Sequence, residues 1–148
     1  MIGSCVIDAS VGIKLFVREQ GTDVVEMVFS GLTEEPPIQL FVPDFFYVEC
    51  ANILWKYVHR YNYASDDAQS DMSDLMQLNL DAVATENLLI VALGIAIEYS
   101  LSVYDACYVA LASLLELPLL TADERLVNKM LGKAYDIRLL GDLEPPAT

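Results

Sequence analysis

The chain has few of the residues that build disulfide frameworks, zinc sites or nucleophile–histidine pairs. Its 148 residues include three cysteines and one histidine, His59. Cys5, Cys50 and Cys107 stand in separate apolar segments, with neither a metal-binding spacing nor an even number for disulfide pairing. We therefore expect buried free thiols, which are typical of a reducing cytoplasm.

Long hydrophobic runs are also missing. The longest, Leu88 to Ile97, is far shorter than the ~20 apolar residues that a membrane helix needs. The first residues lack the basic start of a signal peptide. We expect a cytoplasmic protein with no membrane contact. Hydrophobic residues nevertheless make up 55% of the chain, which suggests strands covered on both faces or an oligomer interface.

Basic residues are scarce. Eight lysines and arginines stand against 22 acidic residues, which gives a formal net charge of −14. This balance argues against broad nonspecific affinity for nucleic acid, which needs a basic footprint. The acidic balance does not exclude a nuclease that binds the phosphates of its substrate through metal ions.

What the chain does contain is a regular alternation of short apolar runs with longer amphipathic ones. This pattern predicts an α/β fold, a parallel doubly wound sheet of about four to five strands flanked by helices. A length of 148 residues suits one domain, which we place at residues 1–141, followed by a loose Pro-Pro tail at 142–148. The expected strands are residues 3–8, 39–42, 80–84, 117–121 and 137–140.

Three acidic residues stand where such a sheet would bring them together. Asp8 ends the first strand, Asp123 follows the fourth, and Asp105 lies in the first turn of an apolar helix that Ser102 can cap. Ligands of doubly wound sheets bind beyond the carboxyl ends of the strands, where the strand order reverses. A purely structural role for Asp105, as the far partner of a capping box, remains open.

A fourth acidic residue, Glu49, has to be carried to that edge by a helix. We expect this helix to run from about residue 45 to 61, with Asp44 as its N-cap. Glu49 shares an i, i+4 stripe with Phe45 and Ile53, so it points where the core should be. A solvated Glu49 head group is the simpler alternative.

These acids occur within motifs that resemble a known family. Tyr104-Asp-Ala-Cys-Tyr-Val-Ala-Leu-Ala, followed by Pro118-Leu-Leu-Thr-Ala-Asp-Glu-Arg-Leu, resembles the C-terminal half of PIN-domain nucleases, especially the VapC-type toxins of toxin–antitoxin systems. Val6-Ile-Asp-Ala-Ser resembles their opening strand. The segment from Pro43 to Asn52 resembles their second acidic helix.

The resemblance implies a metal-assisted ribonuclease that cleaves RNA, with a small antitoxin protein as partner and a homodimeric assembly. Converging carboxylates repel one another unless they hold a cation. All-oxygen ligands favour Mg²⁺, or Mn²⁺, over zinc, and up to two ions are expected. The residues implied are the catalytic and metal-binding acids Asp8, Glu49, Asp105 and Asp123 and the supporting residues Ser10, Asn52 and Thr121. Lys14, Arg18 and Arg125 are the bases expected nearest this edge, which makes them candidates for RNA-phosphate contact, with a role in surface solubility as the alternative.

Three alternatives deserve comparison with this hypothesis. A phospho-acceptor receiver domain usually has paired acids after its first strand, and here Asp8 stands alone. A haloacid-dehalogenase-type phosphatase needs Asp-x-Asp at that point, but Ser10 occupies the second position. A catalytically inactive PIN-fold interaction module would be expected to have lost one of the four acids, and none is missing.

Overall fold

The structure, a computed structural model, describes residues 2–143. Its strands form one parallel sheet in the order β3-β2-β1-β4-β5. The chain begins in the middle of the sheet, builds outward to β3, and then crosses to the other side of β1. The order therefore reverses between β1 and β4, as the α/β hypothesis requires, and the predicted fold class is confirmed. The strands are β1 (Cys5–Ile7), β2 (Leu40–Pro43), β3 (Asp81–Val83), β4 (Leu119–Thr121) and β5 (Ile137–Leu139).

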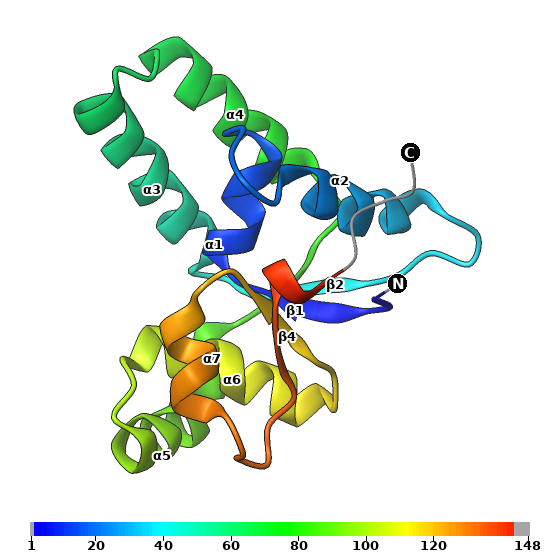
Figure 1. The fold of residues 1–148 in the computed structure, drawn as a ribbon, viewed down its shortest axis with the longest axis vertical. Helices are drawn as coiled ribbons and strands as arrows, with labels where there is room; N and C mark the ends of the chain where they lie inside the picture. Colours follow the sequence, from blue (N-terminus) through cyan, green and yellow to red (C-terminus); the bar gives the residue numbers. More distant parts are fainter. Residues whose placement is uncertain (1, 144–148) are drawn as a thin grey trace.

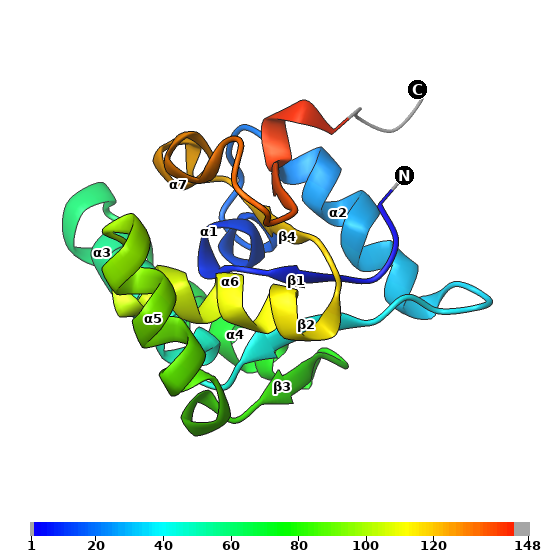
Figure 2. The ribbon, with the colours of Figure 1, turned by 90° about the horizontal axis from the view of Figure 1, so that it is seen from below.

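Helices cover both faces of the sheet. Figure 1 shows α1 to α4 on one side of the sheet and α5, α6 and α7 on the other, and Figure 2 turns the same arrangement by 90°. The first group comprises α1 (Ala9–Gly12), α2 (Thr22–Ser30), α3 (Phe46–Tyr61) and α4 (Ser65–Gln77). The second comprises α5 (Leu89–Tyr99), α6 (Val103–Leu115) and α7 (Glu124–Met130). Short 3-10 turns occupy Ile13–Leu15, Gly31–Thr33, Thr85–Leu88 and Leu140–Asp142.

The core sits where α6 crosses the middle of the sheet. All three residues of β1 are fully buried, because helices lie on both of its faces. On α6 a continuous run from Ala106 to Ala112 is buried, since α5 covers the side that the sheet does not. The three cysteines are free and buried, as expected.

One local expectation needs correction, and a second lies mostly outside the described residues. Asp44 was expected to cap α3, but α3 starts without a side-chain cap at Phe45. The Asp44 carboxylate instead accepts hydrogen bonds from the backbone N–H and the hydroxyl of Thr85, which ties the ends of β2 and β3 together. The expected loose tail, 142–148, begins within the 3-10 turn Leu140–Asp142, and its residues 144–148 lie outside the described part of the chain.

No single helix in residues 2–143 is long and apolar enough to cross a membrane. The segments Thr85–Tyr99 and Val103–Leu115 reach that length and composition only as a pair bent by 116°.

Candidate active site

Asp8 stands at the carboxyl end of β1, beside the point where the strand order reverses. It is the N-cap of α1, and its Oδ1 accepts a 3.2 Å hydrogen bond from the N–H of Val11. The Ser10 hydroxyl donates to Oδ1 at 2.5 Å, and the Thr121 hydroxyl donates to Oδ2 at 2.5 Å. Only 7% of Asp8 is exposed. Both carboxylate oxygens are therefore held by neutral donors in a nearly dry site.

The same two hydroxyls connect Asp8 to the turn between β4 and α7. Ser10 Oγ accepts the N–H of Ala122 at 3.0 Å, and Thr121 Oγ1 accepts the N–H of Asp123 at 3.0 Å. Each hydroxyl can donate and accept at once, so each bridges the ends of two neighbouring strands. Ser10 and Thr121, both expected to support the site, lie directly against Asp8.

Asp123 is the N-cap of α7. Its Oδ1 accepts hydrogen bonds from the N–H groups of Arg125 and Leu126, at 3.0 and 3.4 Å. Capping uses one carboxylate oxygen and fixes the side chain at the start of the helix. Asp123 therefore faces the same edge as Asp8, three residues beyond the buried Leu120 of β4.

Glu49 is carried to this edge by the first turn of α3, as the sequence predicted, and is half-buried. Its Oε1 accepts a 2.6 Å hydrogen bond from the phenol of Tyr108. Tyr108 is 2% exposed, and its ring packs 5.3 Å from that of Phe45. Tyr108 lies three residues after Asp105, near the middle of α6, so the hydrogen bond joins the first turn of α3 to the middle of α6.

Asp105 links the four carboxylates electrostatically. Burial raises the pKa of Asp8 to about 6, against the lowering effect of its hydrogen bonds, and the charge of Asp105 raises it further. Burial also raises the pKa of Glu49, and Asp105 again adds to the increase. The pKa of Asp105 itself is raised by burial and then by the charge of Asp123. The structure therefore brings all four predicted acids to one edge of the sheet.

A cavity of about 250 Å³ opens beside two of these acids. Arg125 and Lys129 lie on its rim, and their charges lower the pKa of Asp105 in opposition to burial. The cavity thus combines anionic and cationic side chains. Its lining residues are Leu101, Ser102, Asp105, Asp123, Arg125, Leu126 and Lys129.

Three sequence-predicted residues are placed less favourably. Lys14 pairs with Glu19 at 3.0 Å, and Arg18 pairs with two acids at 3.0 Å, so both cations are already neutralised. Asn52 is exposed, and within residues 2–143 it makes no hydrogen bond to Glu49. The sequence reasoning missed Lys129, although its spacing of four from Arg125 places both on one face of α7.

The donor chemistry of the four acids fits a hard divalent cation. All donors are carboxylate oxygens, and their pKa values are raised chiefly by burial, with a further contribution from the repulsion between neighbouring carboxylates. Bringing a cation among them would relieve that repulsion. However, no three Asp, Glu, His or Cys side chains of the described residues already form a compact ligand group. The hydroxyl and phenol partners described above hold Asp8 and Glu49 instead.

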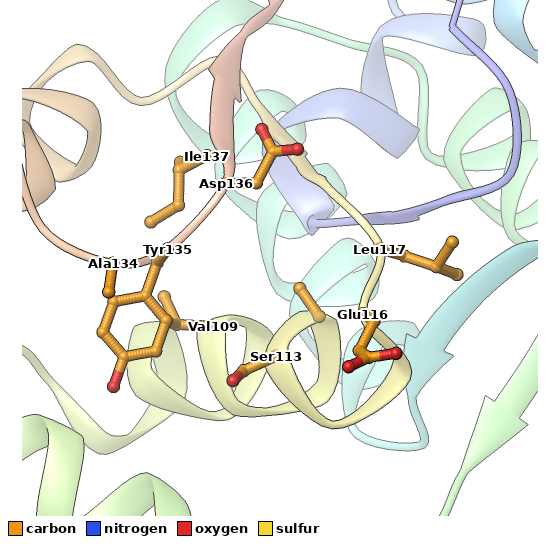
Figure 3. Close-up of a pocket in the computed structure, with 9 residues that line it drawn as sticks. Val109, Ser113, Glu116, Leu117, Ala134, Tyr135, Asp136 and Ile137 are labelled. Atoms are coloured by element: carbon orange, nitrogen blue, oxygen red, sulfur yellow. The ribbon is translucent and has the colours of Figure 1, made fainter.

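A second cavity, of about 270 Å³, lies at the opposite edge of the sheet (Figure 3). It opens between the C-terminal half of α6 and the segment before β5. Glu116 and Asp136 line it together with Tyr135, and the Asp136 carboxylate pairs with Arg138 at 2.9 Å. None of the four acids at the carboxyl edge lines it.

Known proteins share both this sequence pattern and this fold. The pattern that describes the PIN domain matches residues 5–129. Ribonuclease VapC3 of Pyrobaculum aerophilum is 32% identical over 126 residues, which cover 84% of this chain and 92% of that protein. A toxin–antitoxin complex from Klebsiella pneumoniae contains a chain with a similar fold, at a TM-score of 0.64 and 18% identity, covering 93% of this chain and 98% of that one. PAE2754 from Pyrobaculum aerophilum aligns at a TM-score of 0.60 and 22% identity, covering 90% of each chain. The PIN pattern matches most of the chain, and Ribonuclease VapC3 is 32% identical to it. The chain therefore belongs to the PIN domain family.

Proposed function

We propose that this protein is a metal-dependent endoribonuclease that hydrolyses RNA phosphodiester bonds and acts as the toxin of a toxin–antitoxin pair. The observation that carries the proposal is the set of four carboxylates at the carboxyl edge of the sheet, coupled through Asp105. The similarity of the chain to Ribonuclease VapC3 supports RNA as the substrate.

Asp8, Glu49, Asp105 and Asp123 are the residues that would hold Mg²⁺ or Mn²⁺, and the site has carboxylates enough for up to two ions. When bound, such a cation lowers the pKa of a water molecule and neutralises charge at the reacting phosphate. The neutral donors around Asp8 oppose the effect of burial, and with a pKa of about 6 this side chain is mostly anionic at neutral pH.

The remaining residues of the site position these carboxylates. Ser10 and Thr121 hold the two oxygens of Asp8 and the turn that leads to Asp123. Tyr108 orients Glu49 from the adjacent helix. Such partners of metal-binding side chains fix ligand orientation and commonly influence affinity 10–100-fold.

The toxin role implies a protein partner. A small antitoxin with a basic segment would suit an acidic edge on a chain with a net charge of −14. We expect the product of an adjacent open reading frame to bind tightly, and to bind less tightly when Asp8 or Asp123 is changed to Asn. Binding confined to the opposite edge of the sheet would contradict this assignment.

We also infer a homodimer and a cytoplasmic location. Ile90, Leu93 and Ile97 leave an apolar face of α5 exposed, and such faces are typical of subunit interfaces. Sedimentation of the purified chain tests the oligomeric state.

Cleavage of single-stranded RNA tests the enzymatic part of the proposal. We expect cleavage with Mg²⁺ or Mn²⁺, none in excess EDTA, and none by the Asp105→Asn variant. Undiminished cleavage in EDTA would overturn the metal-dependent mechanism. A wild-type protein that binds RNA but never cleaves it would instead favour the inactive interaction module.

A further inference from the structure

Three cations are spaced at intervals of four residues along one side of the candidate active site. Arg125 and Lys129 lie on α7, and Lys133 lies just beyond its end, in a turn closed by a 3.1 Å backbone hydrogen bond to Met130. All three are exposed. Four-residue spacing places Arg125 and Lys129 on one face of α7. Lys133 lies beyond the end of this helix, and its contacts with the end of α5 place it next to Lys129.

Contacts with the end of α5 hold the second and third cations in this row. Lys129 Nζ donates a 2.7 Å hydrogen bond to the carbonyl oxygen of Ser100. Lys133 Nζ lies 5.9 Å from the centre of the Tyr99 ring. Because Ser100 follows Tyr99 directly, these two neighbouring residues anchor two neighbouring cations. We call Arg125, Lys129 and Lys133 the basic row.

The members of the basic row have no carboxylate partner, unlike three other cations of the described residues. Lys14, Arg18 and Arg138 each form an ion pair of 3.0 Å or shorter. Within residues 2–143, no ion pair of that kind involves a member of the row. Unpaired cations on a strongly acidic chain retain their capacity to bind an anion.

The row begins at the predicted acids. Arg125 and Lys129 share the 250 Å³ cavity with Asp105 and Asp123. Beyond Lys133 the chain reaches Tyr135, which packs 5.9 Å from the Tyr99 ring and lines the cavity of Figure 3. A polyanion lying along the row would therefore reach the acidic edge at the Arg125 end.

We propose that the basic row is the track for the RNA backbone, with Arg125 and Lys129 contacting phosphates next to the scissile one and Lys133 the phosphate beyond them. This rests on the proposed ribonuclease function and specifies which side of the acidic site the substrate strand occupies. Because the remaining surface carries most of the chain's negative charge, these few contacts supply a large share of the electrostatic attraction for RNA.

Binding of a labelled single-stranded RNA tests the proposal, using full-length protein with Asp8→Asn so that the RNA stays intact. Affinity is measured by fluorescence anisotropy over a range of salt concentrations in Mg²⁺ buffer. In that background, Arg125→Gln with Lys129→Gln should weaken binding at least about 10-fold. It should also reduce the salt slope by roughly 0.7 for each lost phosphate contact. Lys133→Gln alone should reduce the slope by about half as much as the pair.

The matched control is Lys56→Gln with Arg60→Gln, which removes two exposed cations from α3, about two and three turns beyond Glu49. Both double variants change the net charge equally, so an effect of overall charge would appear in both. We expect the control to change affinity less than about threefold. Equal losses in the two double variants would overturn the track, while leaving the ribonuclease proposal intact. A wild-type protein that neither binds nor cleaves the RNA in Mg²⁺ buffer would overturn both.

Discussion

The phenol of Tyr108 donates a 2.6 Å hydrogen bond to Oε1 of Glu49, joining two residues that lie 59 positions apart in the sequence. Tyr108 also packs against Phe45, one turn before Glu49 on the same side of α3. The ring is thus fixed by packing, and the hydrogen bond from its hydroxyl holds the Glu49 carboxylate in a fixed position. Removing the hydroxyl should release Glu49 without disturbing the core.

Tyr108→Phe should therefore weaken binding of Mg²⁺ or Mn²⁺ about 10–100-fold, as expected for loss of a partner that orients a metal-binding side chain. Stability without metal should change by only about 1 kcal/mol, because half-buried Glu49 can bond to water instead. The measurement is thermal stabilisation as a function of cation concentration. Tyr61→Phe, at an exposed tyrosine of α3, is the control. An unchanged titration midpoint in the Tyr108 variant would show that the hydroxyl does not orient Glu49.

The hydroxyl of Thr121 offers a second test, because it bridges Asp8 and the N–H of Asp123. Thr121→Val keeps the shape of a fully buried side chain but leaves an oxygen of Asp8 without this donor. We expect a loss of about 1–3 kcal/mol in the free energy of unfolding. Thr121→Ser retains the hydroxyl and should lose less. Urea unfolding in EDTA at pH 7 compares them, and equal stability of the two variants would contradict the role of the bridge.

Much of this architecture could be predicted from the sequence. The alternation of apolar runs with amphipathic ones identified the strands of the sheet to within a few residues. The apolar signature is clearest for β1, β2 and β4, which are buried, and weaker for the edge strands β3 and β5. Asp8 and Asp123 were placed at the carboxyl edge because each directly follows such a strand. Glu49 was placed there from its position on an apolar stripe.

The partners of these acids were harder to predict. Tyr108 belongs to the motif around Asp105, but a sequence does not show which distant side chain its hydroxyl contacts. Asp44 followed the ordinary pattern of an N-cap, yet a contact with Thr85, 41 residues away, took its place. Lys14 was expected near phosphate because of its position in the chain, but Glu19 neutralises it through a turn. In each case a tertiary contact outweighed the local preference.

Acidic pH should stabilise the metal-free protein. Burial raises the pKa of Asp8 from its ordinary value of 3.8 to about 6, so between these values the folded state binds more protons than the unfolded state. The free energy of unfolding therefore falls as pH rises from about 4 to 6. Above this range Asp8 contributes no further pH dependence. The difference of about two units corresponds to roughly 3 kcal/mol. The raised pKa values of Glu49 and Asp105 act in the same direction.

Melting temperatures in EDTA between pH 4.5 and 7.5 check this dependence. We expect the highest values toward the acidic end and a smaller slope when Mg²⁺ is present, since the cation takes over the role of the proton in relieving repulsion. A metal-free protein that is more stable at pH 7 than at pH 5 would contradict the assigned pKa directions.

Replacing Asp8 by Asn isolates the charge of this residue. Asn caps helices about as well as Asp, and its side-chain oxygen can still accept a hydroxyl or the N–H of Val11. The variant no longer suffers the cost of a charged group in a nearly dry site. We expect Asp8→Asn to stabilise the metal-free protein at pH 7 by about 1–3 kcal/mol. It should also abolish the stabilisation that Mg²⁺ gives to the wild type and abolish RNA cleavage.

The control is Asp74→Asn, which removes one negative charge from the exposed face of α4 and should change stability by no more than about 0.5 kcal/mol. Melting curves of all three proteins, with EDTA and with Mg²⁺, distinguish a metal-binding carboxylate from a structural one. If Asp8 were only a helix cap, its replacement would be neutral or destabilising without metal, and the wild type would not respond to Mg²⁺. Stabilisation in EDTA together with loss of the Mg²⁺ response is the combination that only a metal-binding role for Asp8 produces, because the same charge must oppose folding alone and support it when a cation is bound.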